Sequence, residues 1–178
     1  MKNIKAEISG NLNISHITKY AKNKDLYGYI KSSKDFCILE GNKKNIDSLV
    51  KILQKRTFLK RERNIVIKEL PYDGKVKNLY ITDHFEDVKL KVYIFISGII
   101  QNVSYDTSTK RFADELGITG WIKNNDDGTI DAKIEGKYNK VEELIEWMKH
   151  GTTKTIIHDF RVEYLKYQNE FKKFNVIK

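Results

Sequence analysis

The sequence contains very few of the residues that cross-link a small protein or interrupt its helices and strands. Among its 178 residues there are one cysteine and one proline. A lone cysteine excludes a disulfide within the chain and a cysteine-based zinc site. Cys37 lies in the stretch FCIL, which is typical of a strand, so we expect a buried and unreactive thiol. With one proline and 40% apolar residues, the chain is expected to form dense regular structure without a disordered linker.

Long apolar runs are also missing. No stretch approaches the length that a membrane-spanning helix needs. The first residues, MKNIKAEISGNL, lack the apolar segment of a secretory signal peptide. We therefore expect a cytoplasmic protein with no membrane partner.

Acidic residues are too few to balance the basic ones, and the imbalance is uneven. The net charge is +9, and residues 1–88 hold 18 Lys and Arg against 11 Asp and Glu. The excess is greatest at 55–63, KRTFLKRER, where Phe58 and Leu59 are interleaved. Such a segment favours binding to nucleic acid or another polyanion. The alternative is a solvated helix end in a chain that is rich in lysine throughout.

The second half of the sequence repeats the pattern of the first. Ile-Ser-Gly at 8–10 recurs 88 residues later, and Gly-Tyr-Ile-Lys at 28–31 recurs as Gly-Trp-Ile-Lys 92 residues later. Glu-Gly at 40–41 recurs after 95 residues. At the same offset, both copies place apolar residues at i, i+3, i+4 and i+7, which is one face of a helix. These residues are Ile46, Leu49, Val50 and Leu53, and Val141, Leu144, Ile145 and Met148.

Each copy continues after this helix with two strand patterns. The first copy has NIVIKEL and then NLYIT, and the second has IIHDFRVEYLKY and then FNVIK. We interpret the chain as a duplicated βαββαβ unit with an extra terminal strand in each copy. The repeat therefore predicts two domains, at residues 1–86 and 87–178.

The stretch 98–111, GIIQNVSYDTSTKR, follows the strand pattern VYIFIS. In that strand, Val92, Ile94 and Ile96 are expected to face the core. A strand that ends in glycine and opens a helix often binds an anion, because backbone N–H groups and the helix N-terminus point to the same place. The residue best placed to reach into this loop is nevertheless a carboxylate, Asp106.

The second copy resembles the acylphosphatase family over residues 90–178. The family's loop, G-x-V-Q-G-V-x-F-R with a threonine three residues later, corresponds to 98–106 and then Thr109. The family's L-G-L-x-G-W-V-x-N motif corresponds to 116–124, and its D-G hairpin to 127–128.

This resemblance implies an α+β fold of two tandem ferredoxin-like sandwiches, each βαββαβ plus an extra strand. Residues 1–86 would form a divergent acylphosphatase-like domain and residues 87–178 an acylphosphatase-like domain. The family hydrolyses carboxyl–phosphate anhydrides without metal or cofactor, so neither is expected. The implied ligand is a phosphate-containing small molecule or another anion, and no particular oligomeric state is implied.

The resemblance also implies roles for individual residues. Asn124 takes the place of the asparagine that positions the attacking water, whereas Asp106 stands where the family has its phosphate-clamping arginine. In the first copy, the asparagine place is Ser32, and the loop contains no arginine. The backbone of five residues would form the phosphate or anion loop: Gln101, Asn102, Val103, Ser104 and Tyr105.

A carboxylate at Asp106 is costly for a phosphate site. An arginine–phosphate bond contributes about 1.5–3 kcal/mol. A carboxylate at about 4 Å adds repulsion of roughly 1–4 kcal/mol. Together these effects predict a rate loss on the order of 10³- to 10⁴-fold.

Three interpretations of Asp106 compete. In the first, a nearby cation, Lys110 or Arg111, substitutes for the clamp. In the second, Asp106 holds a divalent ion that bridges to phosphate. In the third, Asp106 caps the following helix and occupies the anion site with the protein's own carboxylate. The third interpretation favours a tandem acylphosphatase-like protein that is impaired in hydrolysis and acts as a ligand-binding or interaction module. The alternatives are an active acylphosphatase that uses Asn124, and a nucleic-acid-binding module built on the basic first domain.

Overall fold

The chain divides into two compact units, residues 1–88 (unit 1) and 89–178 (unit 2). The basic stretch 55–63 and Ser32 lie outside the residues that the structure describes. Among the described residues, no helix has both the length and the apolar character needed to cross a membrane. The structure is a computed structural model that describes residues 2–10, 12–31, 36–54, 65–82, 84, 87–100 and 104–177.

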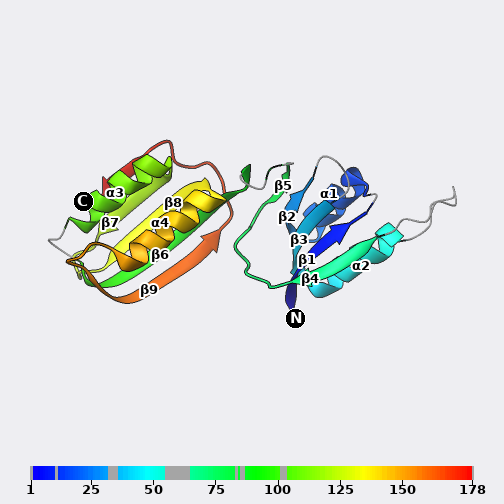
Figure 1. Ribbon diagram of the computed structural model, residues 1–178, viewed down its shortest axis with the longest axis horizontal. Helices are drawn as coiled ribbons and strands as arrows, with labels where there is room; N and C mark the ends of the chain where they lie inside the picture. Colours follow the sequence, from blue (N-terminus) through cyan, green and yellow to red (C-terminus); the bar gives the residue numbers. More distant parts are fainter. Residues whose placement is uncertain are drawn as a thin grey trace. The chain divides into compact units, whose positions relative to one another are not determined.

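Both units have the element order β-α-β-β-α-β-β (Figure 1). Unit 1 contains β1 (Asn3–Ser9), α1 (Ile14–Asn23), β2 (Tyr27–Ile30), β3 (Phe36–Asn42), α2 (Lys43–Gln54), β4 (Val66–Leu70) and β5 (Leu79–Ile81). Unit 2 contains β6 (Lys89–Ile99), α3 (Tyr105–Leu116), β7 (Thr119–Asn124), β8 (Ile130–Lys137), α4 (Tyr138–His150), β9 (Ile156–Leu165) and β10 (Phe174–Ile177).

The two sheets have the same topology. Their strand orders are β4-β1-β3-β2-β5 and β9-β6-β8-β7-β10. The last strand of each unit runs parallel to the second strand, and all other pairs are antiparallel. The first four strands of each unit therefore form a ferredoxin-like sheet, and the predicted α+β fold with two tandem units is confirmed.

In each unit the helices bury an apolar stripe against one face of the sheet. The predicted stripes of α2 and α4 are buried along their whole length. In β6, Val92, Ile94 and Ile96 are fully buried, whereas Tyr93 and Phe95 on the opposite face are half-buried. The alternation expected from the sequence is therefore confirmed.

The strand ladders correct one part of the repeat alignment. Lys5 in β1 lies opposite Glu40, and Lys91 in β6 lies opposite Glu135. This register makes Ile8 equivalent to Ile94, at an offset of 86 instead of the 88 suggested by the Ile-Ser-Gly match. The reason is that β6 extends farther than β1 at the end that leads to the first helix. Compared with unit 1, unit 2 is therefore longer at this place, by two residues more than the Ile-Ser-Gly match indicates.

A matched pair of glycines explains part of the repeat. Gly28 and Gly120 have φ angles of +127° and +147°, which side-chain-bearing residues rarely adopt. A Cβ atom at either position would lie 2.1 Å from a carbonyl oxygen of the neighbouring strand, that of Ile38 or Lys133. Both units therefore need glycine at this place, where two strands approach closely.

Cys37 is fully buried in β3, as expected, and burial raises the pKa of its thiol to about 12. At about pH 8, only on the order of one thiol in 10⁴ is then ionised. We predict that Ellman's reagent labels the native protein very slowly and the urea-unfolded protein within the mixing time. Rapid labelling of the native protein would contradict the buried position of Cys37.

Candidate functional site

The start of α3 is anchored by a buried tyrosine. The Tyr105 hydroxyl donates a hydrogen bond to the Met148 carbonyl at 2.6 Å, and its ring lies 5.9 Å from that of Trp147. Burial raises the pKa of Tyr105 well above its ordinary value, so the hydroxyl remains a donor. Ser104, immediately before the helix, has a left-handed backbone with φ of 55°. These features fix the position from which Asp106 projects.

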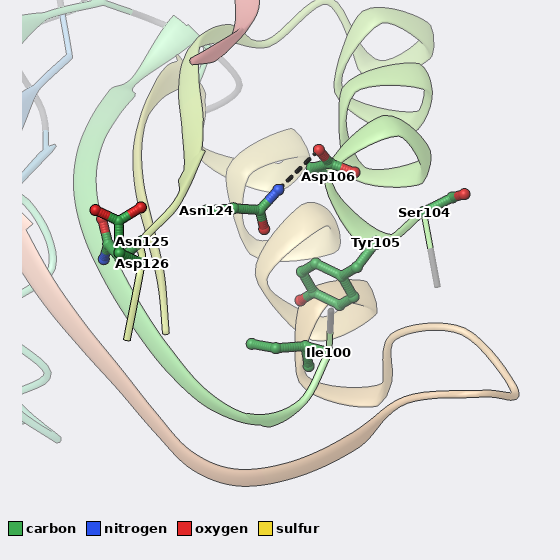
Figure 2. A pocket seen from close by; sticks show the side chains of 7 residues that line it. All are labelled: Ile100, Ser104, Tyr105, Asp106, Asn124, Asn125 and Asp126. Carbon is green, nitrogen blue, oxygen red and sulfur yellow. Dashed lines mark hydrogen bonds between the residues drawn. The ribbon is translucent and has the colours of Figure 1, made fainter. Parts of the chain in front are cut away.

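Asp106 and Asn124 are joined by a direct hydrogen bond. The Asn124 Nδ2 atom donates to Asp106 Oδ2 at 2.9 Å, from the end of β7 to the first turn of α3 (Figure 2). The other carboxylate oxygen accepts from the backbone N–H of Thr107 at 2.7 Å. Ser104, not Asp106, occupies the N-cap position, and its side chain makes no capping bond. The carboxylate therefore binds one N–H group of the helix N-terminus together with the amide of Asn124.

The hairpin after β7 is held by a second polar network. Asn125 Nδ2 donates to Asp131 Oδ2 at 2.9 Å and to Thr129 Oγ1 at 3.0 Å. The Tyr93 hydroxyl donates to the other oxygen of Asp131. This network connects β6, β8 and the hairpin.

These elements surround a pocket of about 420 Å³. Two carboxylates, Asp106 and Asp126, line it together with the amides of Asn124 and Asn125, and no lysine or arginine is among its described lining residues. Ser104 and Tyr105, predicted as loop residues, also line it, whereas Gln101, Asn102 and Val103 lie outside the described residues. Three further lining residues were not predicted from the sequence, although two of them directly follow Asn124: Ile100, Asn125 and Asp126.

Comparisons with known proteins match the second half of the chain, which forms unit 2. The protein-family model named Acylphosphatase matches residues 92–176, all within unit 2. An acylphosphatase of Haloquadratum walsbyi is 37% identical over 78 residues, which are 44% of this chain and 84% of that protein. The chain belongs to the acylphosphatase family. The expected resemblance is thereby confirmed.

Other acylphosphatases match to a similar extent. That of Pyrobaculum calidifontis is 34% identical over 94 residues, which are 52% of this chain and 86% of its own. The crystal structure of acylphosphatase from Bacillus subtilis aligns with a TM-score of 0.48 and 26% identity, over 50% of this chain and 99% of that one.

Neither candidate substitute for the acylphosphatase arginine is among the described residues that line the pocket. Lys110 Nζ donates to Asp114 Oδ2 at 2.7 Å and to the carbonyl of Phe174 in β10 at 3.0 Å. These two bonds hold the ammonium group against β10. Arg111 is exposed on α3 and is not among the described lining residues.

The described residues contain no group of three or more His, Cys, Asp or Glu side chains placed to hold a metal ion.

In unit 1, the helix equivalent to α3 begins differently from the acylphosphatase pattern. Asn13 caps α1 by accepting a hydrogen bond from the His16 backbone N–H at 3.0 Å. Ile8 and Gly28 are 20 residues apart, whereas their counterparts Ile94 and Gly120 are 26 apart, so the first connection of unit 1 is six residues shorter.

Proposed function

We propose that unit 2 is an acylphosphatase-like domain that is impaired in acyl-phosphate hydrolysis and serves as a ligand-binding or interaction module. One observation carries the proposal. At the place of the family's arginine, the Asp106 carboxylate accepts a hydrogen bond from Asn124, the residue at the water-positioning place. Residues 1–86 are, on this proposal, a divergent copy without the phosphate loop.

The charge of the pocket opposes the binding of an acyl phosphate. A phosphate group in the pocket would meet Asp106 and Asp126 without a described lysine or arginine among the lining residues. Repulsion from one carboxylate at about 4 Å is worth roughly 1–4 kcal/mol, depending on screening. The electrophile is then held poorly, and charge that develops in the transition state has no lysine or arginine beside it among the described lining residues.

The hydrogen bond to Asp106 also limits the hydrogen bonds that the Asn124 side chain can donate to a substrate or a water molecule. One N–H of its Nδ2 group points to the carboxylate, so that N–H is not directed at a water or at the phosphate (Figure 2). A carboxylate acceptor makes a charge-assisted bond, which is roughly twice as strong as a neutral one. Breaking it to bind substrate adds to the cost of hydrolysis.

A direct test is the hydrolysis of benzoyl phosphate by the full chain. We predict turnover at least about 10³-fold below that of an acylphosphatase that keeps the arginine. We further predict that Asn124→Ala changes this residual rate by less than about threefold, because the asparagine side chain is bound to Asp106.

The rival function, an active acylphosphatase, predicts the opposite result. The native chain would then be fast, and Asn124→Ala would reduce kcat strongly with little change in KM. Either result would overturn the proposal of an impaired enzyme. Circular dichroism of the Asn124→Ala variant provides the control for correct folding.

A further inference from the structure

Unit 1 has a pocket of about 310 Å³ that differs from the one in unit 2. It lies where the end of β3 meets the connection between β4 and β5, residues 71–78. Glu40 from β3 and Tyr27 from β2 line it, together with Tyr72 and Val76 from the connection. The volume is at the lower end of the range for pockets that bind small molecules.

Glu40 is a buried carboxylate, and one of its oxygens lacks a hydrogen-bond donor among the described residues. The residue is 2% exposed. Its Oε1 atom lies 3.1 Å from Lys5 Nζ, which also reaches Asp73 Oδ2 at 3.2 Å. The Oε2 atom has no hydrogen-bond partner within the described part of the chain. A buried acceptor without a donor is costly, and the cost is larger for a charged group.

The equivalent residue of unit 2 shows which groups donate hydrogen bonds to a carboxylate at this place in the sheet. Glu135 holds the same place opposite Lys91 and is equally buried. Its Oε2 atom accepts from the backbone N–H groups of Glu170 at 2.7 Å and Phe171 at 3.4 Å, and its Oε1 atom accepts from that of Gln168 at 3.2 Å. In unit 2, therefore, the connection between the last two strands closes directly onto the carboxylate. In unit 1, Tyr72 and Val76 of that connection line the pocket together with Glu40.

We propose that the pocket of unit 1 binds a small molecule that carries a primary ammonium group. The ammonium donates to Glu40 the hydrogen bonds that backbone N–H groups donate to Glu135 in unit 2. Neither the family assignment nor the proposed function of unit 2 is required for this site.

The local charges favour a cationic group at Glu40. Two carboxylates, Glu40 and Asp73, share one ammonium, that of Lys5. Burial raises the pKa of Glu40 above its ordinary value, Lys5 opposes this shift, and Asp73 adds to it. A ligand ammonium would supply the missing positive charge, and Tyr27 and Tyr72, whose side chains are of the aromatic kind that attracts cations, also line the pocket. Lys24 and Lys77 also line the pocket, so a ligand with several positive charges is disfavoured.

The test is an NMR titration of the full chain with propylammonium chloride. Sodium propionate and propanol are the matched anionic and neutral probes. Amide signals around Tyr27, Gly41 and Val76 are expected to shift with propylammonium alone. The carboxyl carbon of Glu40 should titrate at lower pH when propylammonium is saturating, because the ammonium stabilises the ionised form.

Two variants make the test specific. Glu40→Gln is expected to weaken propylammonium binding at least about tenfold, whereas Glu135→Gln should leave it unchanged. If Glu40→Gln does not fold, the titration of Glu40 in the native protein decides the question. Equal shifts with propylammonium and propanol, or a Glu40 titration that propylammonium does not move, would overturn the proposal and leave water as the occupant.

Discussion

Replacing Asp106 with arginine is expected to raise the rate of benzoyl phosphate hydrolysis by about 10³- to 10⁴-fold. The substitution removes a negative charge from the pocket and restores the family's cation at the same position in the first turn of α3. It also removes the acceptor of the Asn124 amide, which then becomes available to a water molecule. The two effects act on the same transition state, so their contributions are not expected to be additive.

Three further variants separate these contributions. Asp106→Ala removes the repulsion without supplying a cation, so it should give an intermediate gain. Asn124→Ala added to Asp106→Arg should abolish most of the gain. Glu115→Arg is the matched control, because it makes the same change of charge on the same helix at an exposed residue outside the described pocket lining.

Phosphate affinity should follow the same order as activity. Inorganic phosphate is expected to inhibit Asp106→Arg competitively and to bind the native protein far more weakly. If Asp106→Arg stays inactive although it is folded, the arginine position is not what limits the native protein. The loop between β6 and α3 would then be the cause, and the proposed origin of the impairment would be wrong.

Much of the fold could be predicted from the sequence because the repeat is periodic and local. The apolar positions of α2 and α4 follow helical spacing, and the alternation around Ile94 follows strand spacing. The register of β1 could not be predicted in this way. It depends on which residue lies opposite Glu40 in the sheet, and the recurring Ile-Ser-Gly motif points to a position two residues away.

The two residues at the centre of the candidate site could be identified from the sequence, but their contact could not. Asp106 and Asn124 were identified by the family's motifs, yet their hydrogen bond joins residues that lie 18 positions apart on different elements. The sequence suggested that Asp106 caps α3. The structure instead places Ser104 at the N-cap, and the carboxylate binds Thr107 and Asn124. Such a contact depends on how α3 packs against β7, which no local pattern reports.

The lysine–glutamate pairs, with their buried carboxylates, are another feature that local patterns hide. Lys5 and Lys91 alternate with apolar residues in their strands, which is typical of a solvent-facing position. Lys91 is buried because the connection between β9 and β10 covers it. Its ammonium donates to the side chains of Gln168 and Glu170 within that connection. A long-range cover of this kind leaves no periodic signal in the sequence.

Replacing Lys91 with methionine is expected to lower the free energy of unfolding of unit 2 by about 3–5 kcal/mol. The side chains of Lys91 and Glu135 are 4% and 1% exposed, and Lys91 Nζ lies 3.6 Å from Glu135 Oε1. Methionine has a similar length but no charge, so the buried Glu135 would lose its counter-ion. The backbone N–H groups of the connection would still donate to it, and they would soften the loss without replacing a full positive charge.

The measurement is urea unfolding of the full chain, followed by tryptophan fluorescence. Both tryptophans, Trp121 and Trp147, lie in unit 2, so the signal reports on that unit alone. Lys140→Met is the matched control, because Lys140 pairs with Glu143 at an exposed site and should change stability by less than about 0.5 kcal/mol. A loss below about 1 kcal/mol for Lys91→Met would mean that the backbone donors alone sustain the buried carboxylate. The ligand ammonium that we propose for unit 1 would then act as a donor to Glu40 Oε2, which has none among the described residues. Its positive charge would be the smaller part of its contribution.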